Sequence, residues 1–154
     1  MVVTSDYDYL VALSRKLSED NALFALVDGK FKIDFPAGDI ARTLSSTTDN
    51  RTLISVSLPN VMTKAAMGYD SNGLVYASAM FQIDVASLKG NNSEYCRRVA
   101  NAVKVLIEGD IVQTVGSQYV IYIDRINDNT FYDEAIAAWH SALIVYGEYR
   151  KSSK

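Results

Sequence analysis

The sequence is poor in the residues from which most metal and redox sites are built. Its 154 residues include one cysteine, Cys96, and one histidine, His140. A lone cysteine excludes a disulfide within the chain, and one cysteine with one histidine excludes the usual thiolate and imidazole clusters that bind zinc. We therefore expect Cys96 to be a buried structural thiol, and we expect neither a metal nor a cofactor.

Short catalytic and phosphate-binding motifs are missing as well. The sequence has no Gly-x-Gly-x-x-Gly, no glycine-rich phosphate loop and no His-Glu-x-x-His. A Ser-His-Asp triad could use only His140, which lies in a strand-like run without the sharp turn that presents a nucleophile. The acidic and amide residues from 124 to 129 do not have the spacing of a calcium-binding EF-hand loop. We predict that the chain is not an enzyme.

Long apolar runs and a strong charge of either sign are also lacking. No stretch approaches the roughly 20 apolar residues that cross a membrane, and the first residues, MVVTSDYDYL, do not resemble a secretory signal. The net charge of −3 gives no electrostatic reason for tight nucleic-acid binding, although a weakly acidic wall would let DNA pass without sticking. These features predict a reducing, cytoplasm-like compartment and no membrane partner.

The most informative feature that is present is the run AIAAWHSALIVYGEYR, from Ala135 to Arg150. Side chains alternate between the two faces of a strand, so Trp139, Leu143 and Val145 share one face while His140 and others share the opposite one. Both faces are largely apolar, and each therefore needs a covering layer. The chain's own helices can cover one face. The other face predicts a second sheet or another subunit.

Periodicity along the rest of the chain predicts an α+β fold. Helical spacing covers about residues 5–27 and the segment after Asn91, which forms a capping-box pattern with Glu94. Alternating or apolar patterns predict strands over residues 30–35, 52–58, 61–67, 74–88, 111–115 and 119–127, with turns at 68–73 and 127–129. Tight turns between neighbouring strands make the sheet mainly antiparallel. We expect one domain over residues 1–154, with two helices packed on one face and a long C-terminal strand.

Residues 36–51 differ from the rest in composition. A run of serine, threonine, aspartate and asparagine from Ser45 to Asn50 predicts a mobile loop. Ile40 and Leu44 form a small apolar patch inside it, with Arg42 nearby. Two interpretations stay open: a surface loop held by a couple of apolar anchors, or a segment that becomes ordered only on a partner.

Two stretches carry a resemblance to a known family. They are YASAMFQIDVASLKGNNSEYCRRVANAVKVLIEG, residues 76–109, and FYDEAIAAWHSALIVYGEYRK, residues 131–151. A long strand, a polar break and a helix, followed by a terminal aromatic strand, resemble the tail terminator (tail-completion) proteins of long-tailed bacteriophages. The resemblance implies a structural virion protein that forms a ring, as a homohexamer, which caps the tail tube, ends tail growth and joins the tail to the head connector or stopper protein. It also implies a chain assembled in the host cytoplasm, with genome DNA passing through the ring without specific binding.

Eight residues are candidates for partner or subunit contacts. They are Ile40, Arg42, Leu44, Arg51, Met62, Met67, Tyr146 and Tyr149.

Three other functions remain open from the sequence. The chain could be another neck component, such as a stopper or connector. It could be a small α+β ligand-binding or enzyme domain with a pocket built on His140 and either Asp124 or Tyr122. It could also be a dimeric adaptor that adds strands edge to edge.

Overall fold

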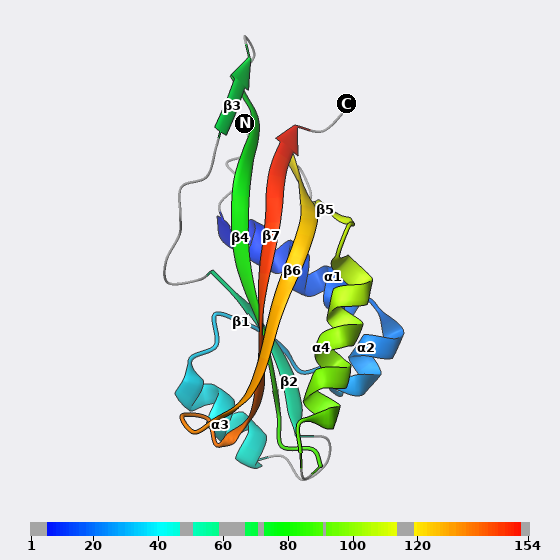
Figure 1. Cartoon of the computed structure of the whole chain (residues 1–154), viewed down its shortest axis with the longest axis vertical. Coiled ribbons are helices and arrows are strands. Elements are labelled where there is room, and N and C mark those ends of the chain that lie inside the picture. Colours follow the sequence, from blue (N-terminus) through cyan, green and yellow to red (C-terminus); the bar gives the residue numbers. More distant parts are fainter. Residues whose placement is uncertain are drawn as a thin grey trace.

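The computed structural model describes residues 6–46, 51–58, 67–70, 73–90, 92–113 and 119–151 (Figure 1). Its elements, in chain order, are α1 (Asp6–Ser18), α2 (Asn21–Leu26), β1 (Phe31–Ile33), α3 (Ala37–Ser46), β2 (Thr52–Ser57), β3 (Met67–Asp70), β4 (Gly73–Ser87), α4 (Glu94–Ile107), β5 (Ile111–Gln113), β6 (Tyr119–Asp133) and β7 (Ala138–Lys151). The strands form one sheet in the order β1-β2-β4-β7-β6-β5, and β3 pairs with β4. Every pairing is antiparallel except that of β1 with β2. The predicted α+β class is confirmed.

Three long strands form the centre of the sheet. The C-terminal strand β7 lies between β4 and β6, and its pairing with β4 runs without interruption from Tyr76 opposite Arg150 to Ser87 opposite Trp139. In Figure 1 these strands continue past α1 and form an extended arm that ends at β3. The predicted long terminal strand is therefore confirmed, and it is a central strand of the sheet.

One face of the sheet carries the main hydrophobic core. Helices α1, α2 and α4 lie on this face (Figure 1), as the leucine stripe of α1 and the apolar stripe of α4 predict. The fully buried side chains at the centre include Leu10, Leu17, Val103, Ile107, Phe81, Ile83, Leu143 and Val145. The two main predicted helices thus pack on one face of the sheet, as expected.

The first predicted helix is divided into two, so the expectation of one helix over residues 5–27 is wrong. Helix α1 ends at Ser18 and α2 begins at Asn21. The carboxylate of Asp20 accepts a hydrogen bond from the backbone N–H of Leu23 at 2.9 Å, which caps the second helix. The acidic residue that starts a new helix also marks the end of the previous one.

Most of the predicted loop over residues 36–51 is a helix. Helix α3 covers Ala37–Ser46, and residues 47–50 lie outside the described part. Ile40 and Leu44, which are 5% and 0% exposed, pack with Leu53 and Ala86 on the face of the sheet opposite the main core. Their i, i+4 spacing after Pro36 is a helical signal that the serine-rich composition obscures.

The turn predicted over residues 68–73 is wrong at its start, because strand β3 covers Met67–Asp70. Residues 61–66, most of the strand predicted before it, lie outside the described residues.

Two other predicted boundaries differ from those of the structure. Strand β6 runs through residues 127–129, where a turn was expected, and the turn to β7 comes at 134–137. Helix α4 has Ser93 at its N-cap, and Asn91, the expected cap, lies outside the described residues. The side-chain oxygen of Asn92 accepts the N–H of Glu94 at 2.9 Å. Asn and Asp occur in strands as well as in turns, so neither is sufficient to end an element.

Candidate functional site

The second face of the sheet is covered at one end only. Helix α3 and the β6–β7 turn cover the end near Ala86 and Ala138. Further along the three long strands, side chains lie in rows across the sheet, one from each strand, and among the described residues no helix packs on them. We call this surface the open face; its rows are Met80–Tyr146–Arg125 and Gln82–Ile144–Asn127.

The open face has a mixed character that suits contact with another protein. Met80, Ile144 and Tyr146 are half-buried, and Arg125 and Asn127 are exposed. The guanidinium of Arg125 lies 4.2 Å from the centre of the Tyr146 ring. An arginine stacked on a tyrosine is the kind of pair that is enriched in protein interfaces.

A cluster of ionisable side chains lies between the open face and α3. The Nε2 atom of His140 on β7 is 2.6 Å from Oδ1 of Asp84 on β4, and its Nδ1 atom is 2.9 Å from Oδ2 of Asp133 on β6. All three side chains are largely buried, with 14%, 12% and 22% of their surfaces exposed. Because each ring nitrogen faces a carboxylate oxygen, both nitrogens must donate, which requires the imidazolium form.

The environment of His140 favours that charged form. Burial alone lowers the pKa of His140, but the hydrogen bonds and negative charges of Asp84 and Asp133 outweigh it and raise the pKa above its ordinary value. An imidazolium held between two carboxylates has no free nitrogen with which to accept a proton. The cluster is therefore suited to joining three strands, and it lacks the free base of a hydrolytic triad.

Cys96 belongs to a separate, buried network on the helix-covered side. Its thiol lies 3.4 Å from the carbonyl oxygen of Val85 and 3.3 Å from the hydroxyl of Ser141, which in turn lies 2.6 Å from Thr130 Oγ1. Burial raises the pKa of Cys96, although hydrogen bonds with Ser141 oppose the effect. The thiol is therefore protonated and inaccessible, in agreement with the structural role that the sequence predicts.

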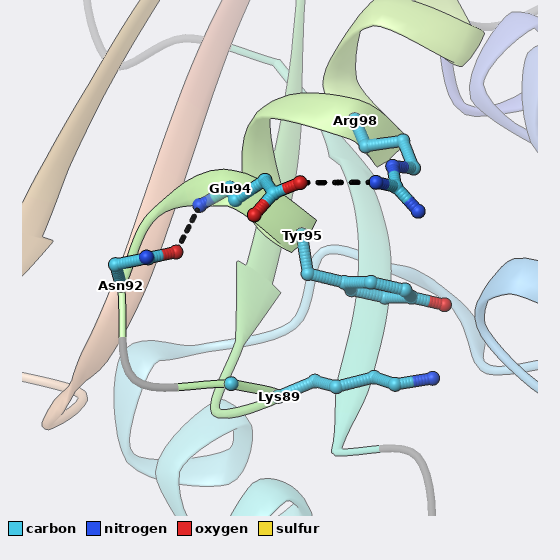
Figure 2. A pocket seen from close by; sticks show the side chains of 6 residues that line it. Lys89, Asn92, Glu94, Tyr95 and Arg98 are labelled. Carbon is cyan, nitrogen blue, oxygen red and sulfur yellow. Dashed lines mark hydrogen bonds and ion pairs between the residues drawn. The ribbon is translucent and has the colours of Figure 1, made fainter.

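A small pocket lies at the start of α4 (Figure 2). Its volume is about 220 Å³, and Lys89, Tyr95 and Arg98 are among its lining residues. Its polar groups pair with one another: Glu94 with Arg98 at 3.1 Å, and the ammonium of Lys89 over the Tyr95 ring at 4.3 Å. These pairings account for its charged groups without a ligand.

The structure separates the residues proposed for an enzyme pocket. His140 contacts Asp84 and Asp133, and neither Asp124 nor Tyr122 is its hydrogen-bond partner.

In the described residues no group of three His, Cys, Asp or Glu side chains is arranged to hold a metal, and no helix there is both long and apolar enough to cross a membrane. Sequence reasoning missed Asp84 and Asp133; the available signal was the carboxylate of Asp84 between the buried Ile83 and Val85.

The eight candidate contact residues are placed in different environments. Ile40 and Leu44 belong to the core of this chain, so they offer no free surface in this conformation, and the exposed Arg42 forms an ion pair with Asp39. Arg51 is exposed before β2, and Tyr146 lies on the open face. Met67 lies in β3 and Tyr149 in β7, but their side chains are outside the described part, and Met62 lies outside the described residues altogether.

Comparisons with known proteins support the fold. No protein-family model matches the chain, and no curated protein matches it. A chain in the virion of a native gene transfer agent particle is similar in structure, with a TM-score of 0.63 at 18% identity, over 92% of this chain and 93% of that chain. A second solved protein, which carries no functional name, has a TM-score of 0.56 at 15% identity over 99% of both chains.

Proposed function

We propose that this chain is a structural subunit of a phage-like virion. The observation that carries the proposal is the fold that it shares, over nearly the whole length of both chains, with a chain of a gene transfer agent virion. More specifically, we propose that it forms a ring, as a homohexamer, that caps the tail tube, ends tail growth and joins the tail to the head connector.

The features of the chain fit a role in assembly. The open face and the extended arm of β3, β4, β6 and β7 offer surface for contact with other proteins. The mild net charge of −3 suits a ring through which DNA slides. A heterologous contact joins two different surfaces of identical subunits. Repeated contacts of this type form a closed ring when the rotation from one subunit to the next divides a full turn evenly.

Another neck component, a stopper or connector, is the second candidate. A stopper or connector would be as compatible with the observed fold as a terminator, and it would also need two contact surfaces. The two kinds of protein would differ in the partner that they bind. Binding to the end of a tail tube, and arrest of tube growth, favours a terminator. Binding to the head connector without an effect on tube length favours a stopper.

Native mass spectrometry with negative-stain electron microscopy tests the ring. We expect six-fold rings with a hole wide enough for duplex DNA, either in solution or on the ends of tail tubes from the same virion. Monomers at every concentration, together with no binding to tubes or connectors, would contradict the proposal.

Variants on two surfaces make the test specific. Tyr146→Ala removes the aromatic ring that lies beneath Arg125 on the open face, and we expect it to reduce ring formation. Arg98→Ala is the matched control, because Arg98 pairs with Glu94 on the exposed surface of α4. Equal loss of rings in both variants would argue against the open face as the subunit contact.

A further inference from the structure

The outer edge of β6 is paired over only part of its length. Strand β5 pairs with residues 120–122, and the backbone N–H of Ile126 donates to Oε2 of Glu108 at 2.7 Å. From there to Asp133, β6 is paired with β7 on its inner side. Among the residues that the structure describes, no strand lies along its outer side over this stretch.

Three residues point their backbone groups toward this edge. Backbone groups alternate along a strand, so the outward N–H of Ile126 implies that those of Asp128, Thr130 and Tyr132 also point outward. The side-chain contacts agree: Thr130 lies 2.6 Å from Ser141, and the Tyr132 ring is 5.6 Å from the Trp139 ring. Such close side chains are typical of opposed residues that do not exchange backbone hydrogen bonds with each other.

The edge has few of the features by which natural sheets prevent an exposed edge strand from pairing with another chain. A β-bulge between Ile123 and Arg125 and the carboxylate of Glu108 protect one end of it. The remainder carries no proline and no lysine of its own. Its two charged side chains already have partners in the chain, because Asp128 lies 3.5 Å from the ammonium of Lys104 and Asp133 lies 2.9 Å from His140. Phe131 and Tyr132 are 37% and 51% exposed and lie on opposite faces of the sheet. A strand added at this edge would shield one aromatic side chain on each face.

We propose that this edge pairs antiparallel with the same edge of a second copy of this chain, around a two-fold axis at Thr130. In this register Asp128 lies opposite Tyr132 of the second copy, Asn129 lies opposite Phe131, and Asn127 lies opposite Asp133. No two like charges are opposed, and each outward pair exchanges two backbone hydrogen bonds.

The neighbouring registers are less favourable. Moving the axis to residue 129 places Ile126 opposite Tyr132 of the second copy, and the bond between Ile126 and Glu108 would have to break. Moving it to residue 131 brings Asp128 level with Glu134, the first residue of the turn after β6, so one pair falls outside the strand and two negative charges come close together. Charge and hydrogen bonding thus select Thr130 as the axis.

The inference does not depend on the proposed virion role. A two-fold pair is a different assembly from a closed ring, so the two can fail separately. An added strand lies in the plane of the sheet, and the open face stays available for other contacts.

Disulfide formation tests the register in the full chain. At the axis, two opposed Cα atoms lie about 5.5 Å apart, within reach of a disulfide. We expect Thr130→Cys to form a covalent dimer under mild oxidation. Both cysteine variants are made in a Cys96→Ala background, because Thr130 and Cys96 both contact Ser141 and a thiol at position 130 would lie near that of Cys96. Asn127→Cys is the control, because its two copies would lie about 20 Å apart. Cross-linking of both variants to the same extent, or of neither, would overturn the proposed register.

Sedimentation velocity tests the backbone contact itself. We expect the wild-type chain to dimerise as its concentration rises. Thr130→Pro removes the outward N–H at an edge position that proline tolerates, and should abolish the dimer. Thr130→Val removes only the hydroxyl and should keep it. A wild-type monomer at every concentration would overturn the pairing, and the cysteine variants decide the question if the proline variant does not fold.

Discussion

His140 and Asp84 join the last strand of the chain to β4, with 2.6 Å between Nε2 and Oδ1. Asp133 holds the second ring nitrogen at 2.9 Å, so one imidazolium connects three adjacent strands. The pKa of His140 is raised in the folded chain. Protonation therefore favours the folded state, and this contribution is lost as the pH rises from the unfolded pKa, about 6.5, through the folded pKa.

The first prediction concerns the pH dependence of stability. We expect the free energy of unfolding to fall over that pH window in the wild-type chain, and His140→Gln to remove this dependence and to cost about 1–3 kcal/mol at the acidic end of the window. Urea denaturation at a series of pH values measures both. Lys104→Gln, which removes a surface cation 3.5 Å from Asp128, is the control and should keep the slope. A slope that persists in His140→Gln would show that other groups produce it.

The second prediction concerns α3. Leu44 is fully buried against the sheet, and we expect Leu44→Ala to lower the free energy of unfolding by about 2–5 kcal/mol. Arg42→Ala is the matched control in the same helix, because the Arg42 side chain is 79% exposed, and its effect should stay within about 0.5 kcal/mol. Thermal and urea unfolding measure the difference. A neutral Leu44→Ala would mean that α3 does not contribute to stability.

The regular elements follow from local patterns, and that is why they could be predicted. Residues that face the core are apolar, so β4 and β7 show an alternating pattern and α1 and α4 each show an apolar stripe. These patterns are visible in the sequence, and the α+β class and the helix-covered face follow from them. Helix α3 was missed because only Ile40 and Leu44 carry its apolar spacing, among serines and threonines that favour loops.

The ionisable cluster could not be predicted, because it depends on register. His140 and Asp133 are seven residues apart across a hairpin, but Asp84 reaches His140 only through the pairing of β4 with β7. A shift of one residue in that pairing would turn Asp84 to the other face of the sheet. Contacts between distant strands are set by the whole fold, and no local pattern encodes them.

The third prediction concerns the reactivity of Cys96. Its thiol is buried and its pKa is raised, so both access and thiolate formation are suppressed. We expect a thiol reagent to label the native chain slowly, and to label it quickly once denaturant unfolds it. Rapid labelling under native conditions would show that the helix-covered face opens readily. The chain is its own control, because Cys96 is its only cysteine.

The fourth prediction contrasts two glycines. Gly147 lies beside the β-bulge of β6, and a Cβ atom there would stand 2.9 Å from the carbonyl oxygen of Tyr122 and 3.0 Å from Cγ2 of Ile121. Because the nearest atom belongs to the backbone, the central strands must move apart to accept it. We expect Gly147→Ala to destabilise the chain by about 1–3 kcal/mol.

Gly38 is the matched control for that substitution. It lies in the first turn of α3, and a Cβ atom there meets nothing within 4 Å. Gly38→Ala should be neutral or stabilise the chain by up to about 1 kcal/mol, because alanine favours a helix more than glycine does. Urea denaturation of both variants should therefore give shifts that differ in sign or size. Equal shifts would mean that β6 and β7 approach each other less closely at Gly147 than the structure describes.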